Sequence, residues 1–250
     1  MSDMNDLATQ KREHVAPKLE FEHRVVANEY GFYCVPKNYL RREVPQLLAN
    51  GEVYEAKTLA FMRRISGRGD IVSGGAFIGD FFPALSEALA PGAALHSFEP
   101  NPLSFMAAQA TIELNGLTNV KMNAVAVGSE PATLPLRIAQ GNQASAARAR
   151  IVKQESADTG TINVPVVTLD ELIPDDRHIS VLHLDIEGFE IEALKGATGI
   201  VSRCKPIIIL EGERHRRRVD YIEALTELLP DIGYRSAGLI ERNAVYMPSR

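Results

Sequence analysis

The chain has 250 residues, of which 45% are hydrophobic and 24% are charged, which suits one α/β domain with an N-terminal extension. Its formal net charge of −5 disfavours a general nucleic-acid-binding protein, which usually carries a basic face. The two cysteines, Cys34 and Cys204, lie far apart and outside any CxxC pattern, which disfavours a disulfide framework and a structural zinc site. Because the chain also lacks an apolar signal peptide or membrane-spanning stretch, we expect a cytoplasmic protein that does not bind membranes.

The N-terminal quarter of the chain predicts a small extension. The expected elements are a loose end over residues 1–18, a hairpin between Phe21 and Val35, and amphipathic helices over Arg41–Asn50 and Tyr54–Ile65. We predict that residues 1–66 form an extension that packs on the core. Residues 67–250 then form the main, ligand-binding domain.

From residue 67 onward, strand patterns alternate with helix patterns. Strands are expected at Asp70–Gly74, 94–100, 119–128, 132–138, 162–169, 180–188, 206–211, 233–237 and Asn243–Met247. Helices are expected at Phe81–Ala90, Pro102–Asn115, Ile191–Ser202 and Asp220–Leu229. This alternation predicts an α/β fold with a mainly parallel sheet that is covered on both faces.

Three segments carry more specific expectations. Pro165 would interrupt a central ladder, so the strand over residues 162–169 is predicted to lie at a sheet edge. The basic run Arg214–Arg218 is typical of a solvated helix start, although its place near the ligand-binding edge also suits an acidic acceptor. The polar segment 140–160 has the length of a lid or binding loop, or of an insertion, and we expect acceptor specificity there.

Polar residues gather where the expected parallel strands end, which is where ligands bind in such sheets. The strands end in SGGAFIGD, SFEPNP, NAVAVG, HLDIEG and LEGE. The first of these reads GGxxxG, whereas a pyrophosphate-binding turn would read GxGxxG. Glycines here allow a tight turn and close approach of a ligand to the backbone, although they also suit a simple packing turn.

Glu99 shifts the balance from a simple packing turn toward a ligand-binding turn. It ends the second strand, 20 positions after Gly79, where a carboxylate can accept hydrogen bonds from both hydroxyls of a ribose. Asn101 then helps to turn the chain into the next helix. An adenosine is therefore expected, and the missing phosphate fingerprint favours S-adenosylmethionine over NAD, because S-adenosylmethionine has no phosphates.

Seven segments, in this order, resemble the FkbM-type methyltransferases over about two-thirds of the chain. They are GEVYE, GAFIGDFFPAL, FEPNP, NAVAVG, VPVVTLDEL, HLDIEGFEIEALKGA and KPIIILE, between Gly51 and Glu211. The resemblance implies a class I methyltransferase fold: a Rossmann-like, doubly wound, seven-stranded, mostly parallel sheet whose last strand is antiparallel. It also implies methyl transfer from S-adenosylmethionine to a hydroxyl oxygen on a sugar, polysaccharide or secondary metabolite.

One position departs from the family pattern. Relatives usually begin the glycine segment with an acid, as DxGAxxGD, whereas this chain has Ser73. Asp70 stands at the start of the strand and cannot replace that acid. Ser73 serves as a smaller hydrogen-bonding group, or Asp80 supplies the charge near the cofactor ammonium, or cofactor binding is weakened.

Candidate roles follow from position along the strand ends. Backbone contacts with the methionine portion are assigned to Gly75, Ala76 and Gly79. Glu99 is assigned to the ribose and Asn123 to the adenine edge. Ser73, Asp80 and Asn101 are further candidates for cofactor binding. An alcohol must lose its proton before or during methyl transfer, which requires a general base or a metal. Asp185 is the first candidate base, or orients the cofactor amine. His183 is a second candidate base, although its strand pattern also suits a buried core histidine.

The remaining candidates concern the acceptor and a metal. Acceptor contacts are assigned to Glu55, Arg148, Arg150, Glu187, Glu211 and His215. The resemblance places the helix that begins near Glu55 over the cofactor, although Glu55 also suits a plain helix start. Asp185, Glu187 and Glu211 offer oxygen ligands for Mg²⁺ or Ca²⁺, but hydrogen bonds to backbone amides explain these acids better, so no metal is predicted.

Two other function classes remain open. A catalytically silent cofactor-binding or scaffold protein is motivated by Ser73, and an NAD-dependent oxidoreductase is disfavoured by the GGxxxG turn and the DIEG segment. The expected partner is a small-molecule or glycan acceptor, and a homo-oligomer stays open.

Overall fold

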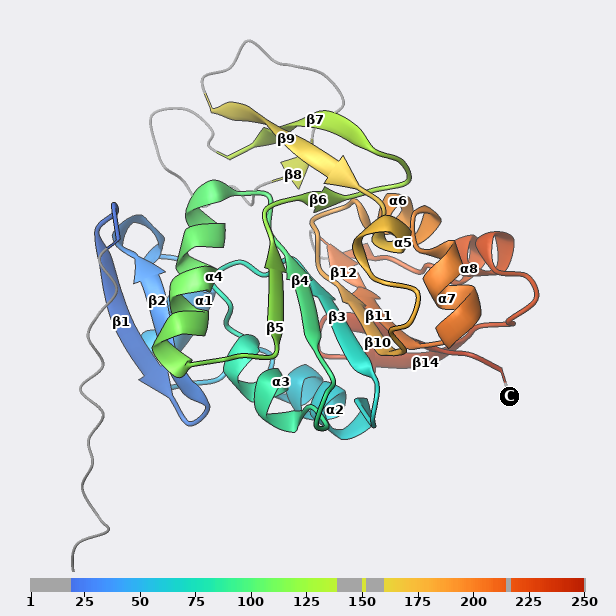
Figure 1. Ribbon diagram of the computed structural model, residues 1–250, viewed down its shortest axis with the longest axis horizontal. Coiled ribbons are helices and arrows are strands. Elements are labelled where there is room, and N and C mark those ends of the chain that lie inside the picture. Colours follow the sequence, from blue (N-terminus) through green and yellow to red (C-terminus); the bar gives the residue numbers. More distant parts are fainter. Residues whose placement is uncertain (1–18, 139–149, 152–159, 215–216, 250) are drawn as a thin grey trace, which may run out of the picture.

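A computed structural model describes residues 19–138, 150–151, 160–214 and 217–249. Its centre is a seven-stranded sheet in the order β14-β15-β11-β10-β3-β4-β5 (Figure 1). The strands in that order are Arg235–Ile240, Asn243–Met247, Ile207–Glu211, Ile179–Leu184, Asp70–Gly74, Leu95–Phe98 and Val120–Asn123. The five strands from β11 to β5 pair in parallel, whereas β15 is antiparallel to both β11 and β14. The predicted class I methyltransferase sheet, with its last strand antiparallel, is confirmed.

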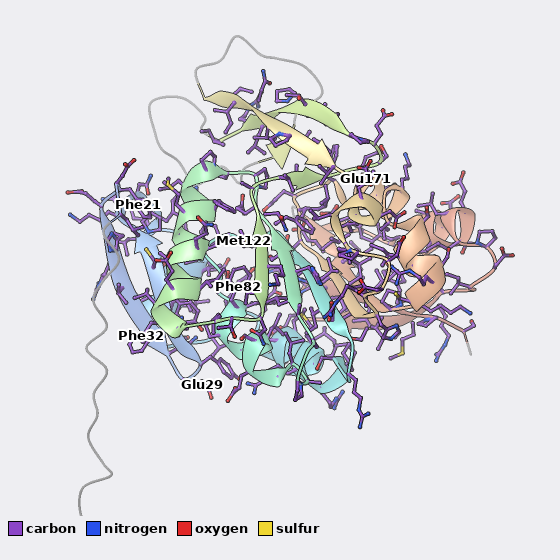
Figure 2. All side chains as sticks on the ribbon, viewed as in Figure 1. Phe21, Glu29, Phe32, Phe82, Met122 and Glu171 are labelled. Atoms are coloured by element: carbon purple, nitrogen blue, oxygen red, sulfur yellow. The ribbon has the colours of Figure 1, made fainter. Side chains whose placement is uncertain are left out.

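Helices cover both faces of this sheet because successive residues of each strand point to opposite sides. The helices are α2 Ala56–Ile65, α3 Phe82–Ala88, α4 Pro102–Asn115, α5 Leu169–Leu172, α6 Glu190–Lys195, α7 Thr198–Cys204 and α8 Ile222–Leu228. On β3, Ile71 packs in the cluster that contains side chains of α2 and α3, whereas Val72 packs with α6, α7 and α8. Phe82 of α3, labelled in Figure 2, is a buried member of the first of these clusters.

The N-terminal segment forms the predicted hairpin and two helices. Strands β1 His23–Asn28 and β2 Gly31–Pro36 pair antiparallel, followed by a short 3-10 turn Lys37–Tyr39 and α1 Glu43–Ala49. The hairpin lies against α4 (Figure 1), where the Asn115 side chain hydrogen-bonds both the N–H and the C=O of Phe32 at 2.9 and 2.7 Å. Phe32 itself points outward and is exposed (Figure 2). Helix α2 contributes Leu59 and Met62 to the same buried cluster as Ile71.

A second, smaller sheet stands beyond the carboxyl ends of β4 and β5 (Figure 1). Its order is β6-β9-β7-β8, with bounds Ala126–Val127, Thr161–Val167, Ala132–Arg137 and Arg150–Ile151. The prediction that β9 is an edge strand is wrong, because β9 pairs with both β6 and β7. Pro165 is tolerated since β6 pairs only with Val166 and Val167, so the proline precedes the part of β9 that has partners on both sides.

Two other expectations are corrected. The helix expected over Ile191–Ser202 is split into α6 and α7 around Gly196, where an added Cβ would lie 2.0 Å from the carbonyl oxygen of Gly128. The chain must bend there because two backbone segments touch. The basic run is not a helix start: β12 Glu213–Arg214 and β13 Arg217–Arg218 pair as a short antiparallel hairpin, and α8 begins at Ile222.

Asp70 holds the amino end of β3 in place. Its carboxylate accepts hydrogen bonds from His96 and from the Arg177 side chain, both at 2.7 Å, and from the Ala94 N–H at 2.9 Å. Burial alone would raise the pKa of Asp70, but these hydrogen bonds outweigh it and lower the pKa below its ordinary value. A lowered pKa means that this stabilisation is present above the ordinary pKa and is lost as the pH falls.

We predict that Asp70→Asn lowers the free energy of unfolding at pH 7 by about 2–3 kcal/mol, because it leaves buried donors without a charged acceptor. The deficit should shrink as the pH falls below about 4, where the wild-type carboxylate is also protonated. Urea denaturation across this pH range measures both effects. Glu192→Gln, at the exposed pair with Lys195, is the matched control and should change stability by less than about 0.5 kcal/mol. A similar loss in both variants would contradict the prediction.

Candidate functional site

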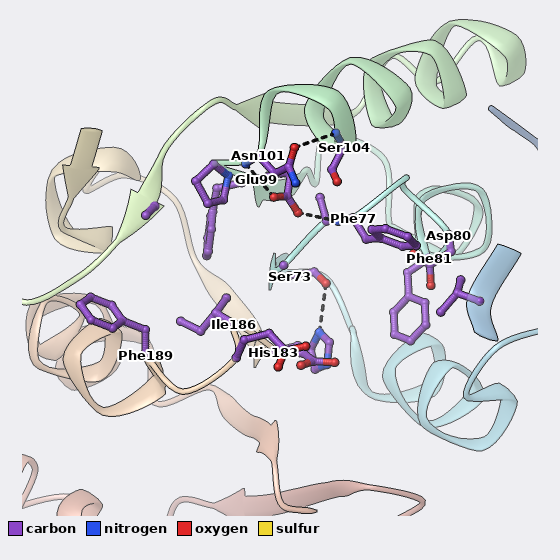
Figure 3. A pocket seen from close by; sticks show the side chains of 18 of the residues that line it. Ser73, Phe77, Asp80, Phe81, Glu99, Asn101, Ser104, His183, Ile186 and Phe189 are labelled. Atoms are coloured by element: carbon purple, nitrogen blue, oxygen red, sulfur yellow. Dashed lines mark hydrogen bonds between the residues drawn. The ribbon is translucent and has the colours of Figure 1, made fainter. Parts of the chain in front are cut away.

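A cavity of about 410 Å³ opens at the carboxyl ends of β3, β4 and β10, a size that suits a small-molecule ligand. Its walls come from three parts of the chain: the segment before α2, the turns that follow the central strands, and the smaller sheet. The polar wall contains Ser73, Glu99 and His183, which Figure 3 shows projecting from neighbouring strands. The apolar part of the lining includes Ala126, Val127, Leu136, Ile151, Ile186 and Phe189.

The glycine turn closes onto the neighbouring strand end. Gly75 has a φ of +81°, and a Cβ at this position would lie 1.9 Å from the carbonyl oxygen of Asp185. The Asp185 N–H donates to the carbonyl of Gly74 at 3.2 Å, and the Ala76 N–H donates to that of Phe98 at the same distance. Only glycine fits where two backbones approach this closely. Gly75 and Ala76, which were assigned to backbone contacts with the ligand, both line the cavity.

Gly79 has a different place. Its N–H donates to the carbonyl of Ala76 at 2.7 Å, and its φ is +77°. It closes the turn from within and is not among the residues that line the cavity, whereas the next residue, Asp80, is. The structure therefore gives Gly79 a turn-forming position and brings Asp80 to the site.

Glu99 is buried at the end of β4. Its two carboxylate oxygens each accept one backbone hydrogen bond, from Phe77 N–H and Asn101 N–H, both at 2.9 Å (Figure 3). Burial raises the pKa of Glu99 to about 7, although these two donors and the nearby Arg42 act in the opposite direction. Each oxygen keeps a further lone pair, so the carboxylate can accept two more hydrogen bonds.

The two asparagines assigned to the cofactor differ in position. Asn101 lines the cavity, but its side-chain oxygen caps α4 by accepting from Leu103 N–H at 3.1 Å, and its amide donates to the Tyr39 hydroxyl at 3.3 Å. Asn123 lies at the end of β5, donates to the carbonyl of Ser97 at 3.5 Å, and is not among the cavity-lining residues. The structure does not bring Asn123 to the cavity.

Several acids meet in the cavity. Glu55, Asp80, Asp185 and Glu187 all line it together with Glu99. Burial and, to a smaller extent, the nearby Glu55 raise the pKa of Asp80 to about 7. Burial likewise raises the pKa of Glu55, whose carboxylate accepts a 2.6 Å hydrogen bond from Asn243. Crowded, partly desolvated carboxylates favour a ligand that carries positive charge or hydroxyl donors.

Ser73 and His183 form a hydrogen-bonded pair across β3 and β10. The Ser73 hydroxyl lies 3.0 Å from Nδ1 of His183 (Figure 3), and both residues are buried and line the cavity. Burial lowers the pKa of His183 to about 4, so the imidazole is neutral near pH 7.

The structure places only part of the other acceptor candidates. Glu211 is buried at the end of β11 and does not line the cavity. For Arg150 only the backbone, in β8, is described. Arg148 and His215 lie outside the described residues. Over the described ranges, no group of three or more His, Cys, Asp or Glu side chains is arranged to hold a metal ion.

Sequence reasoning missed Glu190. This buried residue accepts hydrogen bonds from the N–H groups of Ile186 and Gly188, at 3.3 and 3.1 Å, and from the Tyr221 hydroxyl at 3.2 Å. It closes the turn that carries Asp185 and Glu187. The signal in the sequence was its position, two residues after Gly188 and four residues after Ile186, whose N–H groups it accepts from. Arg42, which lies 3.8 Å from the centre of the Tyr39 ring and lines the cavity, gave no such signal.

We predict that Gly75→Ala destabilises the fold more than Gly92→Ala does. Both glycines have a positive φ, but an added Cβ at Gly92 meets nothing within 4 Å. Gly92→Ala should therefore cost about 1 kcal/mol from backbone strain alone. Gly75→Ala should cost at least about 2 kcal/mol, because it also forces β3 and β10 apart. Chemical denaturation measures both, and equal losses would show that the contact with Asp185 is unimportant.

Comparison with known proteins gives the family. Residues 73–236 match the Methyltransferase FkbM domain family. The protein "Methyltransferase 1" of Beauveria bassiana (strain ARSEF 2860) is 27% identical over 143 residues, which cover 50% of this chain and 57% of that protein. The chain thus matches little more than half the length of this relative.

Two solved structures share the fold. A methyltransferase FkbM from Methylobacillus flagellatus KT has a TM-score of 0.50 and 18% identity, covering 72% of this chain and 43% of its own. Trm5b from Pyrococcus abyssi has a TM-score of 0.50 and 11% identity, and the match covers 93% of this chain and 57% of Trm5b. Identities this low show the fold alone. None of the helices in the described residues is long and apolar enough to cross a membrane.

Because the family match spans more than half of the 250 residues, this chain belongs to the FkbM methyltransferase family.

Proposed function

We propose that this methyltransferase uses S-adenosylmethionine as methyl donor and methylates a hydroxyl oxygen of a sugar, polysaccharide or secondary metabolite. The observation that carries the proposal is Glu99, buried at the end of β4, with one free lone-pair position on each carboxylate oxygen beyond its two backbone bonds. Two acceptor atoms side by side match the two neighbouring hydroxyl groups of a ribose. The GGxxxG turn offers no pyrophosphate fingerprint, which favours the phosphate-free donor.

The described residues fit this donor in charge as well as in size. S-adenosylmethionine supplies an electrophilic methyl group on a positively charged sulfur, beside an ammonium and a carboxylate. Asp80 and Asp185 both line the cavity, where negative charge would stabilise the ammonium and the sulfonium. Gly75 and Ala76 line the same cavity, so the methionine portion is assigned to the part of the cavity next to the glycine turn.

Asp185 is proposed as the group that takes the proton of the acceptor hydroxyl. Its position is fixed by the Gly74 and Gly75 contacts on one side and by the turn that Glu190 closes on the other. In the reaction, a bond forms between the hydroxyl oxygen and the methyl carbon while the carbon–sulfur bond breaks, and sulfur keeps the electron pair. The hydroxyl proton passes to the Asp185 carboxylate. In-line alignment of oxygen, carbon and sulfur supplies much of the rate.

The acceptor is proposed to enter from the side of the smaller sheet. Leu136 of β7 and Ile151 of β8 line the cavity together with Ile186 and Phe189, which gives this side an apolar surface. Such a surface favours an acceptor with an apolar face next to its hydroxyl group. Glu55 and Glu187 remain the candidates for polar contacts with the acceptor.

The competing hypothesis of a silent cofactor-binding protein rests on Ser73 in place of the usual acid. Asp80 lines the same cavity, which supports the view that it carries the charge instead. An NAD-dependent oxidoreductase would need space and amide donors for a pyrophosphate, and the glycine turn is occupied by its own contact with Asp185.

We predict micromolar binding of S-adenosylmethionine and no measurable binding of NAD under the same conditions. Isothermal titration of the ligand-free protein measures both. Transfer of a labelled methyl group to members of a panel of hydroxylated acceptors then tests the reaction itself. Binding without transfer to any acceptor would favour the silent protein, and preferential binding of NAD would refute the proposal.

Ribose binding by Glu99 predicts a specific pH dependence. Because the pKa of Glu99 is raised to about 7, its ionised fraction falls about tenfold from pH 8 to pH 6. Affinity for S-adenosylmethionine should fall over the same interval, since a protonated carboxyl loses acceptor capacity. Asp80 titrates in the same range, so Asp80→Asn is the control that leaves the Glu99 contribution alone. Glu99→Gln should bind weakly at pH 8; full affinity in that variant would refute the ribose assignment.

A further inference from the structure

The imidazole of His183 is held in one orientation by two neighbours. Its Nδ1 lies 3.0 Å from the Ser73 hydroxyl on the adjacent strand, where the two residues stand opposite each other in the β3–β10 ladder. On its face, the ring stacks on Phe81, with 5.7 Å between ring centres and 21° between ring planes. His183 is only 5% exposed and Ser73 only 6%. The ring is therefore fixed by packing as well as by hydrogen bonding.

The second ring nitrogen of His183, Nε2, lacks a hydrogen-bond partner among the described residues. It is buried, although the side chain lines the cavity. A buried polar atom without a partner is costly, and such atoms are rare in folded proteins. A nitrogen of this kind in a ligand cavity indicates a contact that the ligand completes.

The hydroxyl of Ser73 determines whether Nε2 carries a proton. Across the described ranges, the hydroxyl has no hydrogen-bond partner other than Nδ1. A serine hydroxyl has one proton to donate, and donating it to Nδ1 satisfies both atoms. The imidazole is neutral, because burial lowers the pKa of His183 to about 4. When the Ser73 hydroxyl donates to Nδ1, the single ring proton sits on Nε2, which is then a donor.

A hydrogen-bond donor at Nε2 complements the acids that line the cavity. Asp80, after the glycine turn, and Asp185, at the end of the partner strand, are acids that suit the ammonium and the sulfonium of the donor. The carboxylate of the donor's methionine portion requires the opposite: a neutral or positive hydrogen-bond donor. Among the residues that line this part of the cavity, His183 supplies one from a rigid strand.

We propose that Nε2–H of His183 donates to the carboxylate of the methionine portion, and that Ser73 is the positioning residue that keeps the proton on Nε2. This inference rests on the proposed use of S-adenosylmethionine. It assigns His183 to ligand binding and leaves proton transfer to Asp185. It also accounts for Ser73: an acid at this position would accept from Nδ1–H, and the neutral ring would then present a lone pair instead of a proton to the cavity.

The tautomer is tested without any ligand. Nitrogen-15 NMR of ring-labelled histidine distinguishes a protonated Nε2 from a protonated Nδ1, and His183→Gln identifies the signal of His183. We expect the Nε2–H form in the wild-type protein and a mixture of both forms in Ser73→Ala. A wild-type ring protonated at Nδ1, or at both nitrogens at pH 7, would overturn the proposal.

The ligand contact is tested with a matched pair of ligands. S-adenosylhomocysteine contains the amino-acid portion, whereas 5′-methylthioadenosine lacks it. His183→Leu should weaken S-adenosylhomocysteine binding about tenfold and leave methylthioadenosine unchanged. His183→Gln should bind both ligands nearly as the wild type does, because the glutamine amide can place a donor where Nε2 stood. If His183 acted only as a base, His183→Leu would leave the binding of S-adenosylhomocysteine unchanged.

Controls separate the possible failures. Calorimetry and circular dichroism establish that each variant is folded; if His183→Leu is not, Ser73→Ala is measured instead and should weaken S-adenosylhomocysteine alone, about threefold. Equal weakening of both ligands, or no weakening of either, would overturn the contact with the carboxylate. Failure of the wild type to bind either ligand would overturn the proposed function and the carboxylate contact together, whereas a Nδ1–H signal would overturn only the inference about His183.

Discussion

The contact between Gly75 and the carbonyl oxygen of Asp185 is the constraint on which the site depends. It brings the turn after β3 against the end of β10, with the Asp185 N–H bonded to Gly74 in the same place. Two strand ends that touch through bare backbone leave no room for a side chain between them, so polar side chains from both strands must face the space beyond. That space is the cavity. The fold thus positions Ser73, His183 and Asp185 before any ligand is bound.

The same arrangement keeps carboxylates in a partly desolvated place. Burial raises the pKa of both Glu99 and Asp80 to about 7, which means that ionising them opposes folding near neutral pH. A protein retains such groups when a ligand uses them, because binding of a cation or of hydroxyl donors recovers part of that free energy. Asp70 differs from these acids: its partners lower its pKa, and it stabilises the far end of β3.

The amino-acid sequence predicted those features whose signals are local. The bounds of β3 and α4 follow from a short apolar run and from Pro102 after a capping asparagine, and both agree with the structure. Features that depend on contacts between distant segments were not predictable. Gly196 breaks a helix only because Gly128 lies against it, and Asn123 misses the cavity because it turns toward Ser97. Pro165 misled the prediction because its neighbour β6 spans only two residues.

The N-terminal segment shows most directly that the site depends on residues outside the motifs at the strand ends. Glu55 adopts a φ of +45°, and its carboxylate accepts from Asn243, while the Thr58 N–H and hydroxyl bond Glu241 at 2.9 and 2.8 Å. These contacts join residues more than 180 positions apart, so α2 is fixed to β15 and to the turn before it. Glu55 and Tyr54 can line the cavity only because of that connection. Helix α2 and the last strand therefore support one wall of the site from behind: they hold Tyr54 and Glu55 at the cavity without lining it themselves.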